Sequence, residues 1–140
     1  MHKNKLRKKY IKKRKEEFEK KHISEIPLSE NNRIIYVYKD NQKTSQTEIV
    51  CVSFDIKISE DWITILYYDN HHEGLLHRHN IISYNNKANI VGNDGIRRKG
   101  DWKKLLHWAI EDIKKNHIYY KKKFLSRNRS LLRDIKVEYF

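Results

Sequence analysis

Residues 67–79 read YYDNHHEGLLHRH and hold four histidines, two carboxylates and one arginine within thirteen positions. Imidazole titrates near neutral pH, so one histidine can remove a proton while another donates one. If residues 75–82 form a strand, His77 and His79 point to one face and Arg78 points to the other, because side chains alternate along a strand. The spacing therefore predicts a compact titratable site next to a turn.

Three interpretations of these residues stay open at the level of sequence. In the first, His77 and His79 are the base and the acid of an RNA cleavage reaction, and Asp69 orients a histidine from the preceding turn. Either Arg78 or the I-R-R-K patch with Arg97 and Arg98 stabilises the developing phosphate charge. In the second, the two histidines and a residue of the turn bind zinc or a similar divalent ion. In the third, the same groups only hydrogen-bond a structural turn.

The order of these residues resembles the signature of the TumE family, the toxins of bacterial and archaeal toxin–antitoxin modules. The resemblance rests on Y-D-N at 68–70, on Gly74 and on H-R-H at 77–79, and it covers about residues 48–116. In that family a strand ends in Y-D-N, a glycine-containing turn and an H-R-H strand follow, and a helix closes the domain, here expected from Trp102. The resemblance implies a toxin role and a helix-turn-helix antitoxin as partner, without implying a particular reaction.

The net charge of +13 is concentrated at the two ends of the chain. Residues 1–22 hold 11 Lys and Arg against three Glu, and residues 114–140 hold nine against two acids, whereas residues 23–113 hold 11 against 13. Separated positive charge attracts polyanions, which predicts RNA or another nucleic acid as partner. The predicted contacts are Lys8, Lys9, Lys12, Lys13, Arg14, Arg97, Arg98, Tyr119, Lys121, Lys122 and Lys123.

Hydrophobic periodicity predicts an α+β fold. The β-branched and alternating segments predict four strands, at 33–39, 48–58, 62–68 and 75–84. Residues 85–100 contain three of the four glycines and are interpreted as a loop or an irregular hairpin. Asp101 is a suitable N-cap for a helix over 102–126. An antiparallel sheet of about four strands is expected, with this long helix covering one of its faces.

The expected domain organisation has three parts. They are a basic N-terminal helix within 1–26, ended by the polar stretch around Pro27, an α+β domain over 30–126 and a basic tail over 127–140. Cys51 is the only cysteine, so no intramolecular disulfide can form. With no signal peptide and no apolar run near the ~20 residues of a membrane span, a cytoplasmic protein without membrane contact is expected.

Two functional hypotheses follow from the sequence. One is a toxin-like, metal-independent ribonuclease that needs no cofactor and uses the histidine-rich segment as its site. The other is a non-catalytic nucleic-acid-binding protein that binds through its basic termini, with the histidine-rich segment serving only the structure.

Overall fold

The computed structural model describes residues 21–41, 46–72, 75–83 and 90–132. These residues form β1 (Lys21–Ser29), β2 (Asn32–Asn41), β3 (Gln46–Ile58), β4 (Asp61–His72), β5 (Leu75–Ser83), β6 (Ile90–Lys99), α2 (Trp102–Arg127) and α3 (Arg129–Leu132). Each strand pairs antiparallel with its neighbours in the chain, so the order across the sheet is β1 to β6. The prediction of an antiparallel sheet packed on one long C-terminal helix is confirmed.

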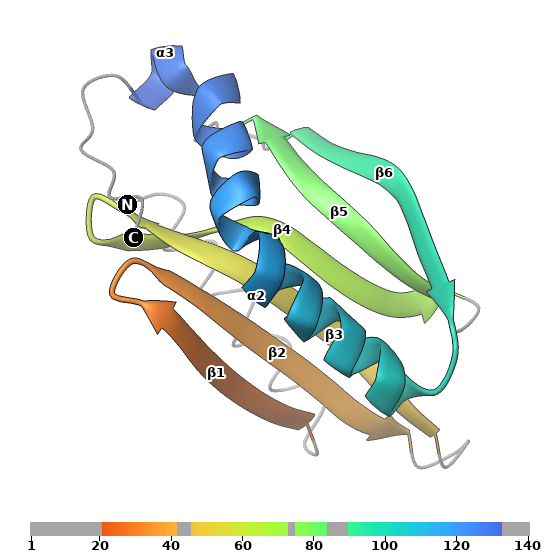
Figure 1. Cartoon of the computed structure of the whole chain (residues 1–140). Helices are drawn as coiled ribbons and strands as arrows, with labels where there is room; N and C mark the ends of the chain where they lie inside the picture. Colours follow the sequence, from red (N-terminus) through yellow and green to blue (C-terminus); the bar gives the residue numbers. More distant parts are fainter. Residues whose placement is uncertain (1–20, 42–45, 73–74, 84–89, 133–140) are drawn as a thin grey trace.

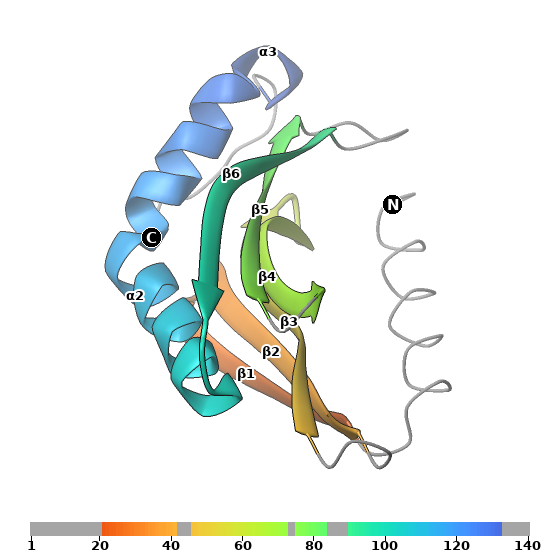
Figure 2. The same ribbon diagram turned by 90° about the vertical axis from the view of Figure 1, so that its right-hand side faces the viewer.

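Helix α2 lies diagonally across one face of the sheet, which we call the helix face (Figure 1). No described element packs on the opposite face, which we call the open face (Figure 2). The core lies between α2 and the helix face, and its buried residues include Ile34, Val52, Phe54, Leu66, Leu76, Leu105, Ala109, Ile113 and Phe124. This apolar layer holds the helix against the strands, because removing apolar surface from water favours the packed arrangement.

Strand β3 shows both the strength and the limit of the alternation pattern. Its predicted core residues are all buried; they are Val50, Val52, Phe54, Ile56 and Ile58. The register with β2 shifts between Val37 and Tyr38, and Ile49, of the opposite parity, is buried as well. A bulge adds one residue to one strand and so changes which parity faces the core.

Strand β1 corrects the prediction for the N-terminal part of the chain. The helix predicted within residues 1–26 overlaps β1 from Lys21 to Ile26, and the polar stretch around Pro27, predicted to end that helix, forms the rest of the strand. β1 is at one edge of the described sheet, where polar side chains and Pro27 are tolerated because one row of backbone groups has no ladder to maintain. The rest of the predicted helix lies outside the described residues.

Strand β6 is the second correction, because the prediction had a loop or an irregular hairpin over 85–100. Gly92 and Gly95 weaken its intrinsic β-propensity, but pairing with β5 supplies its hydrogen bonds. The described sheet thus has six strands rather than four. At the other end, α2 continues to Arg127 and α3 follows, inside the predicted tail; residues 133–140 lie outside the described part.

Local signals correctly placed the elements that carry the site. Ser59 and Glu60 form the two-residue turn between β3 and β4, with φ of 48° and 69°, the positive values that tight hairpin turns require. Asp101 caps α2, because its side chain accepts a hydrogen bond from the backbone N–H of Lys103 at 3.1 Å. No described helix combines the length and the apolar composition that a membrane crossing requires.

Candidate functional site

Four side chains gather on the open face where β4 and β5 pair. Tyr67 is opposite His79, and Asp69 is opposite His77. Opposed residues in an antiparallel ladder project from the same face, so we name these four residues the open-face cluster. Asp69 is a strand residue rather than a turn residue, because β4 continues as far as His72.

The open-face cluster places one carboxylate beside one of two neighbouring imidazoles. His79 Nε2 lies 3.3 Å from Asp69 Oδ2, and these side chains are 24% and 13% exposed. The His79 ring stacks on Tyr67 with a centroid separation of 4.6 Å and an interplanar angle of 21°. The ring centroids of His77 and His79 are 6.4 Å apart. The structure therefore brings together His77, His79 and Asp69 from the predicted catalytic set.

This arrangement can perform acid–base chemistry. The Asp69 carboxylate lies beside His79 Nε2 and can orient the imidazole ring, and Nδ1 is the ring nitrogen that this carboxylate does not contact. A proton-transferring atom must come within about 2.6–3.2 Å of its oxygen partner. A centroid separation of 6.4 Å allows both imidazoles to reach oxygens of one phosphodiester placed between them.

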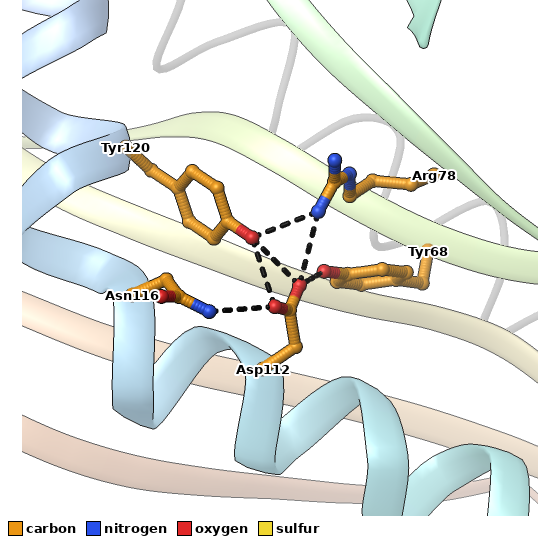
Figure 3. Close-up of polar contacts among 5 residues, drawn as sticks. All are labelled: Tyr68, Arg78, Asp112, Asn116 and Tyr120. Carbon is orange, nitrogen blue, oxygen red and sulfur yellow. Dashed lines mark hydrogen bonds and ion pairs between the residues drawn. The ribbon is translucent and has the colours of Figure 1, made fainter. Parts of the chain in front are cut away.

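Arg78 lies on the other side of the sheet, in a set that we name the helix-face cluster: Tyr68, Arg78, Asp112, Asn116 and Tyr120 (Figure 3). The Tyr68 hydroxyl donates to Asp112 Oδ2, and Arg78 Nη1 donates to the same oxygen at 3.2 Å. Asn116 Nδ2 donates to Asp112 Oδ1 at 2.8 Å. The Tyr120 hydroxyl lies 2.9 Å from each carboxylate oxygen and also accepts from Arg78 Nη1 at 2.8 Å. The structure thus does not bring Arg78 together with His77 and His79.

The helix-face cluster stabilises the packing of α2 against β4 and β5. A carboxylate has about four acceptor positions, and donors from four residues fill those of Asp112. Burial, then the hydrogen bond and the charge of Asp112, raise the pKa of Tyr68 far above its usual value. The same causes raise the pKa of Tyr120 to about 12. Both phenols therefore stay protonated at neutral pH and remain donors to the carboxylate.

The residues of the Y-D-N and H-R-H motif lie on different faces of the sheet. Tyr68 and Arg78 point to α2, whereas Asp69, His77 and His79 point to the open face. Asn70 is buried, and its Oδ1 accepts a hydrogen bond from the Ile49 backbone N–H at 2.8 Å. The motif thus supplies two contacts to α2, from Tyr68 and Arg78, and one hydrogen bond with the backbone, made by Asn70. Its other residues, Asp69, His77 and His79, belong to the open-face cluster.

The sequence-based prediction of the site did not include Asp112, Asn116 or Tyr120. A signal was present, since the three residues follow one another at intervals of four and so share one side of a helix. Nothing in the sequence named their partners, because Tyr68 and Arg78 are more than 30 positions away.

The predicted nucleic-acid contacts have different surroundings. Arg97, Arg98, Tyr119, Lys122 and Lys123 are exposed. Lys8, Lys9, Lys12, Lys13 and Arg14 lie outside the described residues.

Lys121 is a correction, because it is fully buried and its Nζ donates to Asn32 Oδ1 at 2.8 Å. Phe124 and Leu125, three and four positions further along α2, are buried as well, so Lys121 lies on the packed side of the helix. The position after Tyr120 therefore faces β2, and Lys121 is a structural residue rather than a nucleic-acid contact.

Comparison with known proteins identifies no relative: no family model, no curated protein and no solved structure matches this chain. Within the described residues, no group of three or more His, Cys, Asp and Glu side chains is arranged to hold a metal ion.

Proposed function

We propose that this protein cleaves RNA by acid–base catalysis at the open-face cluster. The observation that supports the proposal is the placement of His77 and His79 side by side on the open face, with Asp69 3.3 Å from His79 Nε2. A carboxylate-oriented histidine beside a second histidine supplies both proton transfers of a phosphodiester transesterification. The net charge of +13 suits a polyanionic substrate.

In the proposed reaction His79 is the base and His77 is the acid. His79 Nδ1 takes the proton of a ribose 2′-hydroxyl, whose oxygen attacks the adjacent phosphorus. The bond from phosphorus to the 5′-oxygen breaks, and His77 donates a proton to the departing oxygen. The products are a 2′,3′-cyclic phosphate and a 5′-hydroxyl end. Arg97 is opposite His77 on β6, so its cation is the one from the predicted set that the register brings nearest to the developing charge.

We further propose that the cleavage serves a toxin–antitoxin module, with a cognate antitoxin as the physiological partner. This setting rests on the Y-D-N and H-R-H resemblance. Growth arrest on induction of the wild type, but not of His77→Ala/His79→Ala, is the expected result. Release of the arrest by the product of a neighbouring gene would identify the antitoxin.

The direct test uses purified protein and a fluorescent single-stranded RNA in the presence of a chelator. His77→Ala and His79→Ala are each expected to lower the cleavage rate by about 10²–10⁴, the usual contribution of a general acid or base. His107→Ala is the matched control, because this histidine is exposed on α2. RNA whose 2′-hydroxyls are methylated should not be cleaved. Equal cleavage by all three variants would refute the proposal.

A second candidate function is nucleic-acid binding without catalysis. It is favoured by the C-terminal part of α2, where Tyr119 is 61% exposed and Lys122 and Lys123 are exposed beside it. Here the wild type binds RNA with strong salt dependence and leaves it intact. Lys122→Gln/Lys123→Gln then weakens binding, whereas His77→Ala/His79→Ala leaves it unchanged. Cleavage by the wild type would rule this candidate out.

A further inference from the structure

A cluster of cations surrounds the junction of β6 and α2, next to the open-face cluster. We name it the β6–α2 corner; its members are Arg97, Arg98, Lys99, Lys103 and Lys104, and all five are exposed. These eight positions, 97–104, hold five of the 11 basic residues of the otherwise acidic segment 23–113. Their one acid, Asp101, is engaged in capping α2. The corner is therefore a local positive region within the part of the chain that carries the two histidines.

Three of the four other described cations of this segment form ion pairs inside the fold. Arg33 pairs with Asp55, Lys39 with Glu48 and Arg78 with Asp112. Among the described residues, the side chain of the fourth, Lys57, has only a contact with the Trp62 ring. By contrast, within the described part of the chain no ion pair is formed by a member of the corner, although Arg98 lies over Trp108 and Lys103 over Trp102. Charges without internal counterions are the ones that can exchange solvent ions for a polyanion.

The strand register connects the corner to the histidines. Arg97 is opposite His77 and Lys99 is opposite Leu75, so both basic residues are on the histidine side of β6. Neighbouring strands are about 4.8 Å apart, and residues two apart on one strand are separated by roughly 7 Å. Beyond Lys99, the chain turns into the first turn of α2, where Lys103 and Lys104 follow (Figures 1 and 2). Arg97 and Lys99 thus lie on the side of the open-face cluster, and Lys103 and Lys104 follow at the start of α2, on the helix side of the sheet.

We propose that the β6–α2 corner binds the phosphates of single-stranded RNA that flank the phosphate held by His77 and His79. This inference rests on the proposed function and names its substrate class. An extended single strand places successive phosphates at separations that alternate residues on a strand can match. A single strand also leaves its riboses mobile enough for attack by the 2′-hydroxyl, whereas a stacked A-form duplex does not.

The test compares two quadruple variants that lose the same charge. The corner variant is Arg97→Gln/Lys99→Gln/Lys103→Gln/Lys104→Gln, which keeps Arg98 because of its contact with Trp108. The control variant is Lys114→Gln/Lys115→Gln/Arg127→Gln/Arg129→Gln, whose four residues are exposed on α2 and α3. Binding is measured by fluorescence anisotropy with a short 2′-O-methyl RNA, which cannot be cleaved, between about 50 and 200 mM salt.

The corner variant should bind at least about tenfold more weakly than the wild type, and its salt slope should fall by about 2 to 3, since each phosphate contact contributes about 0.7. The control variant should change affinity by less than about threefold. Equal losses in both variants would overturn the proposal, as would a corner variant that binds RNA as tightly as the wild type does, or a wild type that does not bind RNA. Equal affinity for a duplex of the same sequence would overturn the assignment to single strands.

Cleavage of unmodified RNA separates this inference from the proposed function. If the corner variant binds RNA weakly but the wild type does not cleave it, RNA binding by the corner is supported and the catalytic proposal is refuted. If the corner variant cleaves with unchanged KM and binds RNA as the wild type does, the catalytic proposal is supported and RNA binding by the corner is refuted. With both correct, the corner variant raises KM more than it lowers kcat, because its residues bind flanking phosphates.

Discussion

Asp69 and Asp112 are two carboxylates on opposite faces of the same pair of strands, and their surroundings differ in the number of donors. Asp112 accepts hydrogen bonds from two tyrosines, an arginine and an asparagine. Asp69 pairs with one histidine at 3.3 Å, and this histidine is 24% exposed. A carboxylate with filled acceptor positions holds elements together, whereas one that orients a titratable ring leaves that ring able to exchange protons. Stability and chemistry thus lie on opposite sides of β4 and β5.

The largest expected effect comes from removing the helix-side carboxylate. Asp112→Ala leaves the partly buried Arg78 without its carboxylate and leaves two tyrosines without their acceptor, so the free energy of unfolding should fall by about 3 kcal/mol. Urea denaturation of the purified variant measures this loss. Asp69→Ala is the control and should lower stability by less than about 1 kcal/mol. Equal losses would show that both carboxylates are structural.

Substitution of the other carboxylate, Asp69, tests the role of the open-face cluster in cleavage. Asp69→Asn keeps the shape of the side chain but can hold the wrong tautomer of His79, so the cleavage rate should fall by about ten- to a hundredfold while the free energy of unfolding stays nearly the same. Single-turnover cleavage of RNA, compared with urea denaturation of the same preparation, separates the two effects. An unchanged rate in a protein that does cleave RNA would remove Asp69 from the proposed mechanism.

Two adjacent lysines give a smaller contrast within one turn of α2. Lys121→Gln should lower the free energy of unfolding by about 1–2 kcal/mol without weakening RNA binding, because the residue is buried against Asn32. Lys122→Gln, at an exposed position, should leave stability within about 0.5 kcal/mol of the wild type. Thermal denaturation and anisotropy titrations of both variants check these outcomes. Weakened binding by Lys121→Gln at unchanged stability would contradict its structural role.

The smallest effect concerns alkaline pH. Tyr120 has a pKa of about 12 in the folded protein and about 10 when unfolded, so its stabilising contribution is complete below pH 10 and is lost as the pH rises through 12. Tyr120→Phe should therefore be less stable than the wild type by about 1 kcal/mol at neutral pH. The difference should shrink between pH 10 and 12. Urea denaturation at several pH values measures it, and a constant difference would exclude this linkage.

Much of the scaffold could be predicted from local patterns. The alternation in β3, the apolar run of β4 and the Asp101 cap of α2 are properties of short segments, and the structure confirms the elements they predicted. The edge strands could not be predicted in this way. β1 contains Lys21, Glu25 and Pro27, and β6 contains two glycines, so their extended conformation depends on pairing with β2 and β5 rather than on their own propensities.

The sequence by itself determined that Asp69, His77 and His79 are available, and that strand alternation separates the two histidines from Arg78. Only the tertiary structure decided that Asp112 of α2 engages Arg78 and that Lys121 is buried. It also decided that Arg97 lies opposite His77. The physical reason is that alternation and helical period are set within a few residues, whereas the partner of a buried charge depends on how distant elements pack.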